Sequence, residues 1–283
     1  IGMPSRIYVL STQVIQYVYM GTTSGMREAT ALSVVLMVIA VITMALGNRL
    51  LRRKRYTLVG GKSARVLPVS LGRFKIPALI VSGLLGMVLV ILPIGAIVVT
   101  SFIRIFGEPI TLENLSLEHY AYILTFRTAM EAFWNSFFLG IVAATLALLV
   151  ASLIAYYRVK VKSPLARAAD LIATVPYATP GTVIALALII TFSGKYGLNL
   201  YNTFAILIVA YIVKYLAFSV RTVCASLEQI DLSLEEAAQI SGASWMQSFR
   251  DIILPLVRPG LIAAWFLVFM TTFYELTMTI LLY

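Results

Sequence analysis

Residues Glu236–Pro255 read E-A-A-Q-I-S-G-A-S-W-M-Q-S-F-R-D-I-I-L-P, a polar-faced segment between two strongly apolar runs. Ser233 lies three residues before Glu236. This is the spacing of a capping box, in which each side chain satisfies the other's backbone N–H at a helix N-terminus. Gly242 suits the left-handed residue at which a helix stops. The first part of the segment is therefore predicted to form a short helix that ends in a glycine turn.

A second helix is predicted directly after this turn. Ser244 and Gln247 repeat the capping-box spacing, and Pro255 discourages the helix from continuing, because proline lacks the N–H that a helix needs. One stripe of this helix is apolar and consists of Trp245, Phe249, Ile252 and Ile253. Two partners could cover the stripe: membrane helices of the same chain, as is common for a capped helical hairpin, or another protein.

The complete pattern is Glu236-Ala237-Ala238, three residues, Gly242, nine residues, Ile252, one residue and then Leu254-Pro255. It resembles the EAA loop in the membrane subunits of bacterial ABC importers. The resemblance implies that the loop lies in the cytoplasm and that its hairpin docks in a groove of a separate ATPase subunit. The residues that it assigns to ATPase coupling are Glu236, Ala237, Ala238, Gly242, Ile252, Leu254 and Pro255.

Several of these residues also have a purely local explanation. Glu236 could be only the capping-box partner of Ser233, and Ala237 and Ala238 could be only good helix formers. Small side chains also allow a helix to approach a groove closely, which favours an interface role for the two alanines. Gly242 is required by the turn in either case.

The composition indicates a membrane protein. Hydrophobic residues make up 60% of the 283 residues and charged residues only 12%, against about 25% in ordinary globular chains. The net charge of +10 comes from basic residues that lie between apolar runs, as on cytoplasmic loops, and not from one basic domain that would bind nucleic acid. We therefore predict an all-α, polytopic transmembrane bundle in the inner (plasma) membrane, and the resemblance implies the type I permease kind.

Six apolar runs are long enough to cross about 30 Å of hydrocarbon. They are Ala29–Leu46, Ile76–Ile103, Trp134–Tyr157, Leu171–Phe192, Phe204–Val220 and Leu261–Tyr283. Nine basic residues and no acidic residue occupy 49–75, which places this linker in the cytoplasm. Counting the spans from there puts 104–131 outside and the loop 221–258 in the cytoplasm, as the resemblance requires.

The chain divides into three parts. Residues 1–48 are expected to be the end of a first permease unit with one span, 49–75 the basic linker, and 76–283 a second unit with five spans. The chain lacks an initial Met and stops inside an apolar run, so we expect it to belong to a longer protein. Two units in one chain are similar to the double-length ABC permeases, which include the ferric-iron permeases. The stretches most similar to that branch are Ala29–Lys62, Pro176–Thr182, Tyr211–Gly242 and Glu275–Leu282.

Two ionisable residues lie inside apolar runs, where a charge costs about 2.5–3.5 kcal/mol on insertion scales. Lys214 could snorkel to the membrane surface or line the solute path. Glu275 could line the path, or pair with Lys214 or with a helix outside this chain. Proline and glycine interrupt the fourth run, either as an ordinary kink or because this segment lines the path. The candidate path residues are Pro176, Pro180, Gly181, Lys214 and Glu275.

Several kinds of site are missing from the sequence. The P-loop pattern is incomplete, because Tyr56 stands where the first glycine would precede Gly61-Lys62-Ser63. One cysteine, Cys224, and one histidine, His119, provide neither a disulfide nor a metal cluster. We therefore predict no enzymatic activity, cofactor or metal site in this chain. The resemblance implies that ATP and Mg bind to a partner ATPase dimer and that an extracytoplasmic binding protein delivers the solute.

The resemblance implies transport by alternating access, in which ATP-driven closure of the ATPase subunits moves the hairpin and opens the path. Ferric iron is the expected solute, and a permease of the same family could instead import a polyamine, thiamine or an oxyanion. An alternative from another class is a secondary transporter that uses Lys214 and Glu275 as an ion relay.

Overall fold

The computed structural model describes residues 9–20, 23–52, 71–105, 107–195 and 197–283. In these residues the regular structure is helical, and extended pairing is limited to two isolated bridges, Ile103–Leu115 and Ser193–Asn199. The all-α prediction is confirmed. Most of the basic linker, including Tyr56 and Gly61-Lys62-Ser63, lies outside the described residues.

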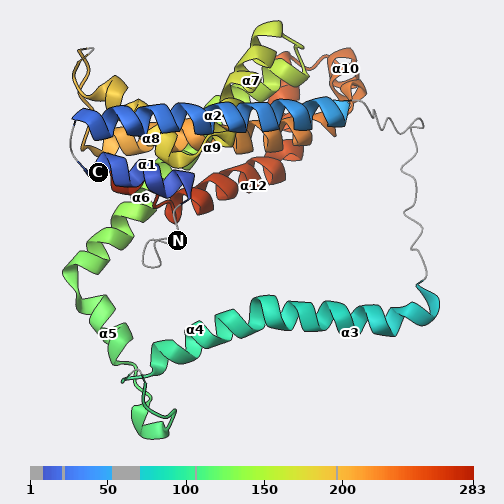
Figure 1. The fold of residues 1–283 in the computed structure, drawn as a ribbon. Coiled ribbons are helices and arrows are strands. Elements are labelled where there is room, and N and C mark those ends of the chain that lie inside the picture. Colours follow the sequence, from blue (N-terminus) through green and yellow to red (C-terminus); the bar gives the residue numbers. More distant parts are fainter. Residues whose placement is uncertain (1–8, 21–22, 53–70, 106, 196) are drawn as a thin grey trace. The chain divides into compact units, whose positions relative to one another are not determined.

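The chain forms two compact units (Figure 1). One comprises Ile1–Arg55 and Asn135–Tyr283, and the other comprises Tyr56–Trp134. Helix α6 (Arg127–Val159) begins in the second unit and continues into the first. The other helices of the first unit are α1 (Leu10–Tyr19), α2 (Thr23–Arg52), α7 (Pro164–Ala178), α8 (Gly181–Phe192), α9 (Phe204–Glu228), α10 (Leu232–Ile240), α11 (Trp245–Ser248), α12 (Leu254–Phe273) and α13 (Thr279–Leu282).

Five helical runs in the described residues are long and apolar enough to cross a membrane. They are Gly25–Leu46, Gly72–Phe102, Arg127–Val159, Phe204–Glu228 and Trp245–Phe273. The pair α7 and α8 is a sixth candidate, and its two helices meet at 111°. Each predicted run thus corresponds to one of these, but the fourth is broken into two helices and the sixth begins and ends earlier than predicted.

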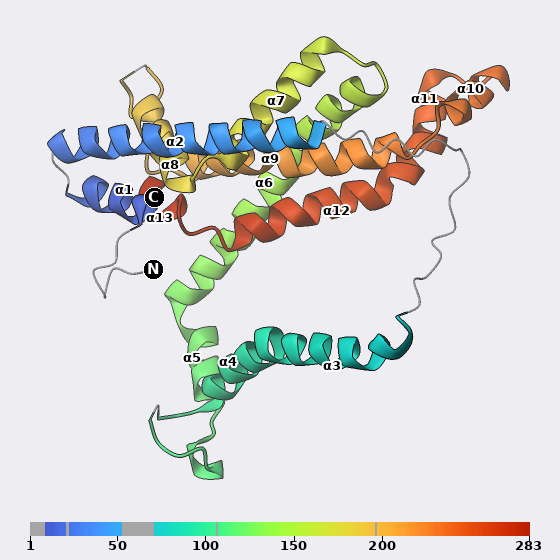
Figure 2. The ribbon, with the colours of Figure 1, turned by 45° about the vertical axis from the view of Figure 1, so that its right-hand side comes forward.

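Helix α9 is the centre of the first unit, where it packs against α12, α7 and α8 (Figure 2). Helix α1 packs along α2, and both of them contact α8. Small residues on α6 bring further helices close, as in other membrane bundles. Four alanines at every fourth position of α6 are fully buried: Ala143, Ala147, Ala151 and Ala155.

Gly260 lies at a close approach of α12 to α9. A Cβ atom added to Gly260 would lie 2.6 Å from the Cβ of Ser226 on α9, a separation that real side chains do not tolerate. The contact between these two helices therefore depends on the missing side chain. Both helices flank the loop 221–258, so this contact lies directly beneath the predicted hairpin.

The second unit contains α3 (Lys75–Gly86), α4 (Leu92–Phe102) and α5 (Glu118–Thr125). A π-turn at Met87–Ile91 joins α3 to α4 into one run. Pro93 follows this turn in the first turn of α4, where its missing N–H is tolerated. The most apolar part of the run Gly72–Phe102 has no residue buried within the unit. This is expected of a helix that faces lipid or other membrane helices.

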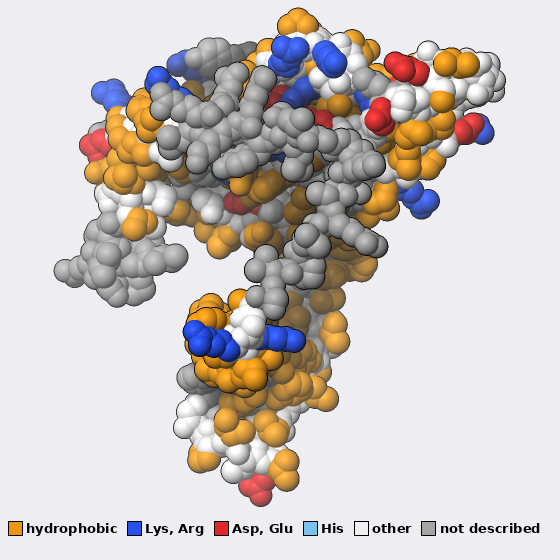
Figure 3. Space-filling model, turned by 90° about the vertical axis from the view of Figure 1, so that its right-hand side faces the viewer, with side chains coloured by type: hydrophobic (Ala, Val, Ile, Leu, Met, Phe, Trp, Pro, Cys, Tyr) orange, Lys and Arg blue, Asp and Glu red, His pale blue; other side chains and the backbone are white. Residues whose placement is uncertain are grey.

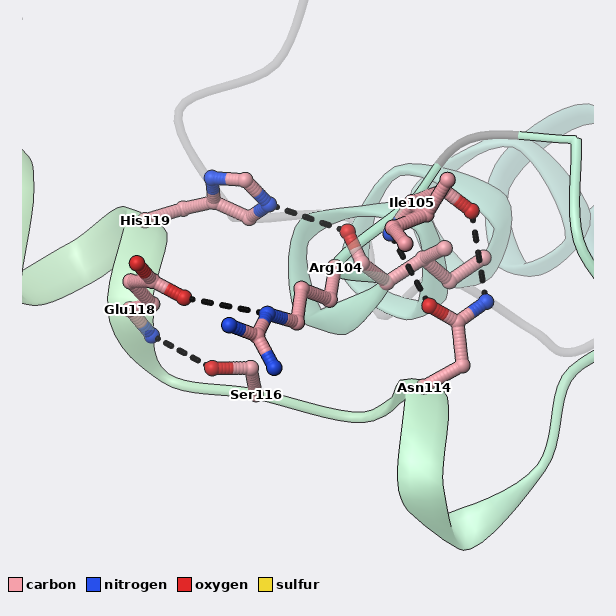
Figure 4. Close-up of polar contacts among 7 residues, drawn as sticks. Arg104, Ile105, Asn114, Ser116, Glu118 and His119 are labelled. Carbon is pink, nitrogen blue, oxygen red and sulfur yellow. Dashed lines mark hydrogen bonds and ion pairs between the residues drawn. The ribbon is translucent and has the colours of Figure 1, made fainter.

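A polar turn connects α4 to α5 (Figure 4). The Asn114 side chain accepts the Ile105 N–H at 2.9 Å and donates to the Ile105 carbonyl at 3.2 Å. The Arg104 Nε atom lies 3.3 Å from the Glu118 carboxylate, and His119 Nε2 lies 3.0 Å from the carbonyl that follows α4. These contacts hold the start of α5 against the end of α4.

Candidate functional site

The first helix of the hairpin, α10, has Asp231 as its N-cap. The Asp231 carboxylate accepts the Ser233 N–H at 2.9 Å, and this hydrogen bond lowers the pKa of the carboxyl group. The predicted capping box of Ser233 and Glu236 is therefore wrong: Asp231 takes the N-cap position and places Ser233 inside the first turn. Glu236 is exposed on α10, so its side chain is available for a contact outside the chain.

The glycine turn and the second cap are confirmed. Gly242 has a φ of +87°, which is the left-handed conformation that glycine adopts without strain. Its N–H donates to the Gln239 carbonyl at 2.9 Å, which closes the end of α10. Ser244 and Gln247 then cap α11 reciprocally, with distances of 2.8 Å from Ser244 N to Gln247 Oε1 and 3.3 Å from Gln247 N to Ser244 Oγ.

The second helix of the hairpin does not stop at Pro255. A π-turn at Phe249–Ile253 joins α11 to α12, and Pro255 lies in the first turn of α12. The prediction that Pro255 discourages continuation is therefore wrong, because the π-turn directly before Pro255 adjusts the hydrogen-bond ladder around the missing N–H. The result is one helical run of 29 residues, Trp245–Phe273, in which the hairpin continues directly into the last membrane span.

The apolar stripe of the hairpin is covered in part by the same chain. Trp245 stacks on Phe249 with ring centroids 5.5 Å apart, and the Tyr156 ring of α6 lies edge-on to both at 6.1 Å. Trp245 Nε1 donates to the Tyr156 hydroxyl at 2.9 Å. Ile253 is buried, whereas Trp245 keeps half of its surface exposed. Of the two partners that the sequence allowed for the apolar stripe, the same chain therefore covers a part of it and leaves the rest exposed.

Apolar side chains also remain on the outer surface of the hairpin. Ile240, at the end of α10, is 88% exposed, and Met246 on α11 is 61% exposed. In Figure 3, hydrophobic and acidic side chains lie side by side on the hairpin, at the upper right of the view. The hairpin therefore presents a mixed apolar and acidic surface.

The seven predicted coupling residues do not form a single patch. Of these, Glu236, Ala237 and Gly242 are exposed on α10 and its turn, and Ala238 is half-buried beside them. The other three lie where the hairpin joins the last span: Ile252 is half-buried, and Leu254 and Pro255 are exposed. The first group forms the tip of the hairpin and the second group forms its base.

The sequence reasoning missed an ion pair that holds the hairpin. Lys160 Nζ, just after α6, lies 2.5 Å from the Glu235 carboxylate on α10 and donates to the Ile230 carbonyl at 3.2 Å. The Lys160 side chain is only 5% exposed and that of Glu235 15%. Glu235, the acidic residue directly before Glu236, was visible in the sequence. Its spacing along the chain gave no indication that it would pair with Lys160.

The break between α7 and α8 is held by Lys214 of α9. Its ammonium group donates to the carbonyls of Pro176 at 3.4 Å and Tyr177 at 3.3 Å, and also to the carbonyl of Thr179. The last carbonyls of a helix have no partner within it and carry partial negative charge, so a cation suits them. Lys214 therefore faces the helix break and not the membrane surface.

Glu275 lies in a second helix break, which the predicted run Leu261–Tyr283 did not anticipate. Helix α12 ends at Phe273, and α13 begins at Thr279. The Glu275 carboxylate accepts the hydroxyl of Tyr215 on α9 and the Met278 N–H at 3.0 Å. One turn earlier on α9, the Tyr211 hydroxyl lies 2.7 Å from the Thr279 hydroxyl. A part-buried polar network thus ties this break to α9.

The two breaks adjoin each other. A Cβ atom added to Gly181, the first residue of α8, would lie 3.2 Å from the Met278 side chain and 3.5 Å from that of Thr277. Lys214 and Tyr215 are consecutive on α9, one bonded to each break. We call this region the helix-break junction; it comprises Pro176–Gly181, Glu275–Thr279, Tyr211, Lys214 and Tyr215. The structure brings all five candidate path residues to it.

A bundle of apolar spans with an exposed hairpin built into its last span defines the class of a multi-pass membrane protein. Residues 145–283 match the family described as binding-protein-dependent transport system inner membrane component. The matched residues, which include the hairpin and the helix-break junction, are just under half of the chain. It is an inner-membrane protein of the ABC importer permease kind, and the resemblance inferred from the EAA-like loop is confirmed.

Two similar proteins are ferric permeases of Haemophilus influenzae. The chain is 38% identical over 157 residues to the Fe(3+)-transport system permease protein FbpB 2, covering 56% of this chain and 31% of that protein. It is 28% identical over 265 residues to the putative ferric transport system permease protein FbpB 1, covering 90% and 40%. The sulfate transport system permease protein CysT of Salmonella typhimurium is 35% identical over 145 residues, covering 48% and 50%. The chain thus spans from about a third to half of the length of these relatives.

Proposed function

We propose that this chain forms the solute path of an ATP-driven importer and couples that path to a separate ATPase subunit through the hairpin α10–α11. The observation that carries the proposal is the continuity of the hairpin with the last span, Trp245–Phe273. The exposed apolar side chains of Ile240 and Met246 support it, because such residues on a capped, ordered hairpin are typical of a protein contact.

The coupling residues have distinct parts in this proposal. Glu236, Ala237 and Ala238 contact the ATPase groove, and Gly242 sets the angle between the two hairpin helices. Ile252, Leu254 and Pro255 join the hairpin to the last span. ATP and Mg bind to the partner ATPase dimer, and a binding protein delivers the solute at the outer face. The family match supports this division of labour, because the family is named for its dependence on a binding protein.

We propose ferric iron as the solute, since two similar permeases are named for it. The sulfate permease among the relatives supports an oxyanion as the second candidate. In cells that express the assembled transporter, we expect unlabelled ferric iron to compete with the uptake of radiolabelled ferric iron. Excess sulfate, polyamine or thiamine should leave that uptake unchanged. Uptake of labelled sulfate, with no uptake of iron, would replace iron by an oxyanion.

We also propose that the solute path passes the helix-break junction. Irregular backbone at membrane depth is tolerated where it is buried in protein or lines a water-filled cavity. Broken helices in other transporters place their ends at the solute or ion site. Pro176, Pro180 and Gly181 break one span here, and Glu275 lies at the other break. Lys214 bonds backbone carbonyls at the first break, which assigns it the role of holding the path wall.

Replacing Glu275 by glutamine tests the role of its charge. Glutamine keeps the size of the side chain and can still accept the Met278 N–H, so the fold should persist. We expect Glu275→Gln to lower uptake about tenfold at an unchanged protein level, because a half-buried charge beside the path affects every passing ion. The matched control is Glu131→Gln, an exposed acid near the start of α6. Normal uptake by Glu275→Gln would remove Glu275 from the path.

A further inference from the structure

The C-terminal end of α6, together with Lys160 directly after it, contacts both helices of the hairpin, although it lies far from them in sequence. Lys160, which follows α6, pairs with Glu235 of α10 at 2.5 Å and bonds the Ile230 carbonyl that precedes this helix. Tyr156, one turn earlier, accepts a hydrogen bond from Trp245 of α11 at 2.9 Å. Each hairpin helix is therefore attached to the same end of α6 by its own polar contact.

The burial of the ion pair indicates a positional role. Withdrawing two charges from water is costly, and an apolar pair of similar volume would often stabilise such a position as well or better. An ion pair that is supported by a hydrogen bond to the backbone instead fixes the distance and orientation of the groups that it joins. Lys160 supplies this constraint twice, because the same ammonium group bonds Glu235 and the Ile230 carbonyl.

The same end of α6 is also anchored in the membrane bundle. The buried residues Ala151 and Ala155 of α6 belong to one apolar cluster with Val223 of α9 and Val257 of α12. The ring of Tyr156, the residue after Ala155, meets the rings of Trp245 and Phe249. A shift of the hairpin would therefore pull on the end of α6 through these polar contacts. The packed alanines of α6 lie directly next to that end, so the shift would also reach the membrane bundle.

We propose that Lys160 and Tyr156 are positioning residues that clamp the hairpin to α6, so that α6 moves together with α9 and α12 when the ATPase moves the hairpin. The clamp consists of the pairs Lys160–Glu235 and Tyr156–Trp245. This inference rests on the proposed coupling function of the hairpin. It adds a third membrane helix to the two that the chain joins to the hairpin covalently.

The test measures solute uptake per ATP hydrolysed in the assembled transporter, reconstituted in vesicles with its binding protein. We expect Lys160→Met and Glu235→Gln each to lower this ratio about tenfold, because each leaves one buried charge without its partner. The exchange Lys160→Glu with Glu235→Lys should restore a large part of the ratio. A purely structural role would instead lower the amount of assembled protein and leave the ratio of the surviving complexes unchanged, and that result would overturn the proposal.

Tyr156→Phe provides a second, milder variant that keeps the ring contacts and removes only the hydroxyl that accepts from Trp245. It should lower the same ratio even if the Lys160 and Glu235 variants do not assemble; an unchanged ratio in this variant would then overturn the clamp. The control is the exposed pair Arg127–Glu131 at the first turn of α6, where Arg127→Ala and Glu131→Ala should leave the ratio unchanged.

A parallel sample with Gly242→Asp distinguishes a failure of the clamp from a failure of the coupling function. If Gly242→Asp releases the ATPase subunit and the clamp variants keep a normal ratio, the clamp is wrong and the coupling function stands. If Gly242→Asp retains the ATPase subunit and full uptake, the coupling function itself is wrong.

Discussion

Replacing Gly242 by aspartate is expected to abolish uptake while the protein still inserts in the membrane. Gly242 has a φ of +87° and no atom within 4 Å of the position of an added Cβ, so the new side chain meets no clash within the chain. The backbone strain costs about 1 kcal/mol or more, which is too small to unfold a membrane bundle. In the proposed coupling role, uptake is lost because the substitution places a charged side chain on the tip that would contact the ATPase subunit. Co-purification of that subunit in mild detergent measures the effect.

The control for this substitution is Gly107→Asp in the polar turn between α4 and α5. Gly107 has a φ of +99° and the same open surroundings, so it carries the same strain outside the hairpin. We expect Gly107→Asp to retain both the ATPase subunit and uptake. Loss of the ATPase subunit from both variants would show that backbone strain alone decides the outcome. A Gly242→Asp protein that keeps its ATPase subunit would contradict the docking role.

Replacing Lys214 by methionine is expected to abolish uptake and also to destabilise the protein. Methionine has a similar length but cannot donate to the carbonyls of Pro176, Tyr177 and Thr179 at the end of α7. Hydrogen bonds to charged groups contribute about 1.5–3 kcal/mol each, and buried carbonyls that lose a donor are costly. We expect the free energy of unfolding to fall by about 3 kcal/mol. The thermal unfolding midpoint in detergent and uptake in vesicles check the two effects.

Lys75→Met serves as the control for Lys214→Met. Lys75 begins α3 and is exposed, so its replacement should change neither the unfolding midpoint nor uptake. Lys214→Arg is a useful companion, because it keeps the charge and changes the geometry. A Lys214→Met protein with a normal midpoint and normal uptake would show that the break between α7 and α8 does not depend on this ammonium group.

The features that the sequence predicted well depend on neighbours in the chain. The glycine turn at Gly242 and the capping box of Ser244 and Gln247 follow from residues two or three positions apart, and the structure has both. The order of the apolar spans follows from hydropathy, which needs no knowledge of packing. The cap of α10 was mispredicted because two residues able to cap, Asp231 and Ser233, lie two positions apart, and only one can hold the N-cap position.

The features that the sequence did not predict depend on contacts between distant segments. Apolar character continues to Tyr283, but the helix ends at Phe273, where Glu275 bonds Tyr215 and the Met278 backbone. The only partner that the sequence suggested for Lys214 was Glu275, but among the described residues Lys214 bonds backbone carbonyls that only the sharp bend of α7 and α8 exposes. Hydropathy and spacing contain no information on such acceptors.

The close approach of α12 to α9 at Gly260 provides a point about which the run Trp245–Phe273 could pivot. Gly260 lies near the middle of this run, with the hairpin at one end and the break that contains Glu275 beyond the other. At about 1.5 Å per residue the run is roughly 40 Å long, enough to cross the whole hydrocarbon layer. A rotation about the contact at Gly260 would move the two ends of this run in opposite directions. In the proposed transport role, this one helical run would therefore close one side of the solute path while it opens the other.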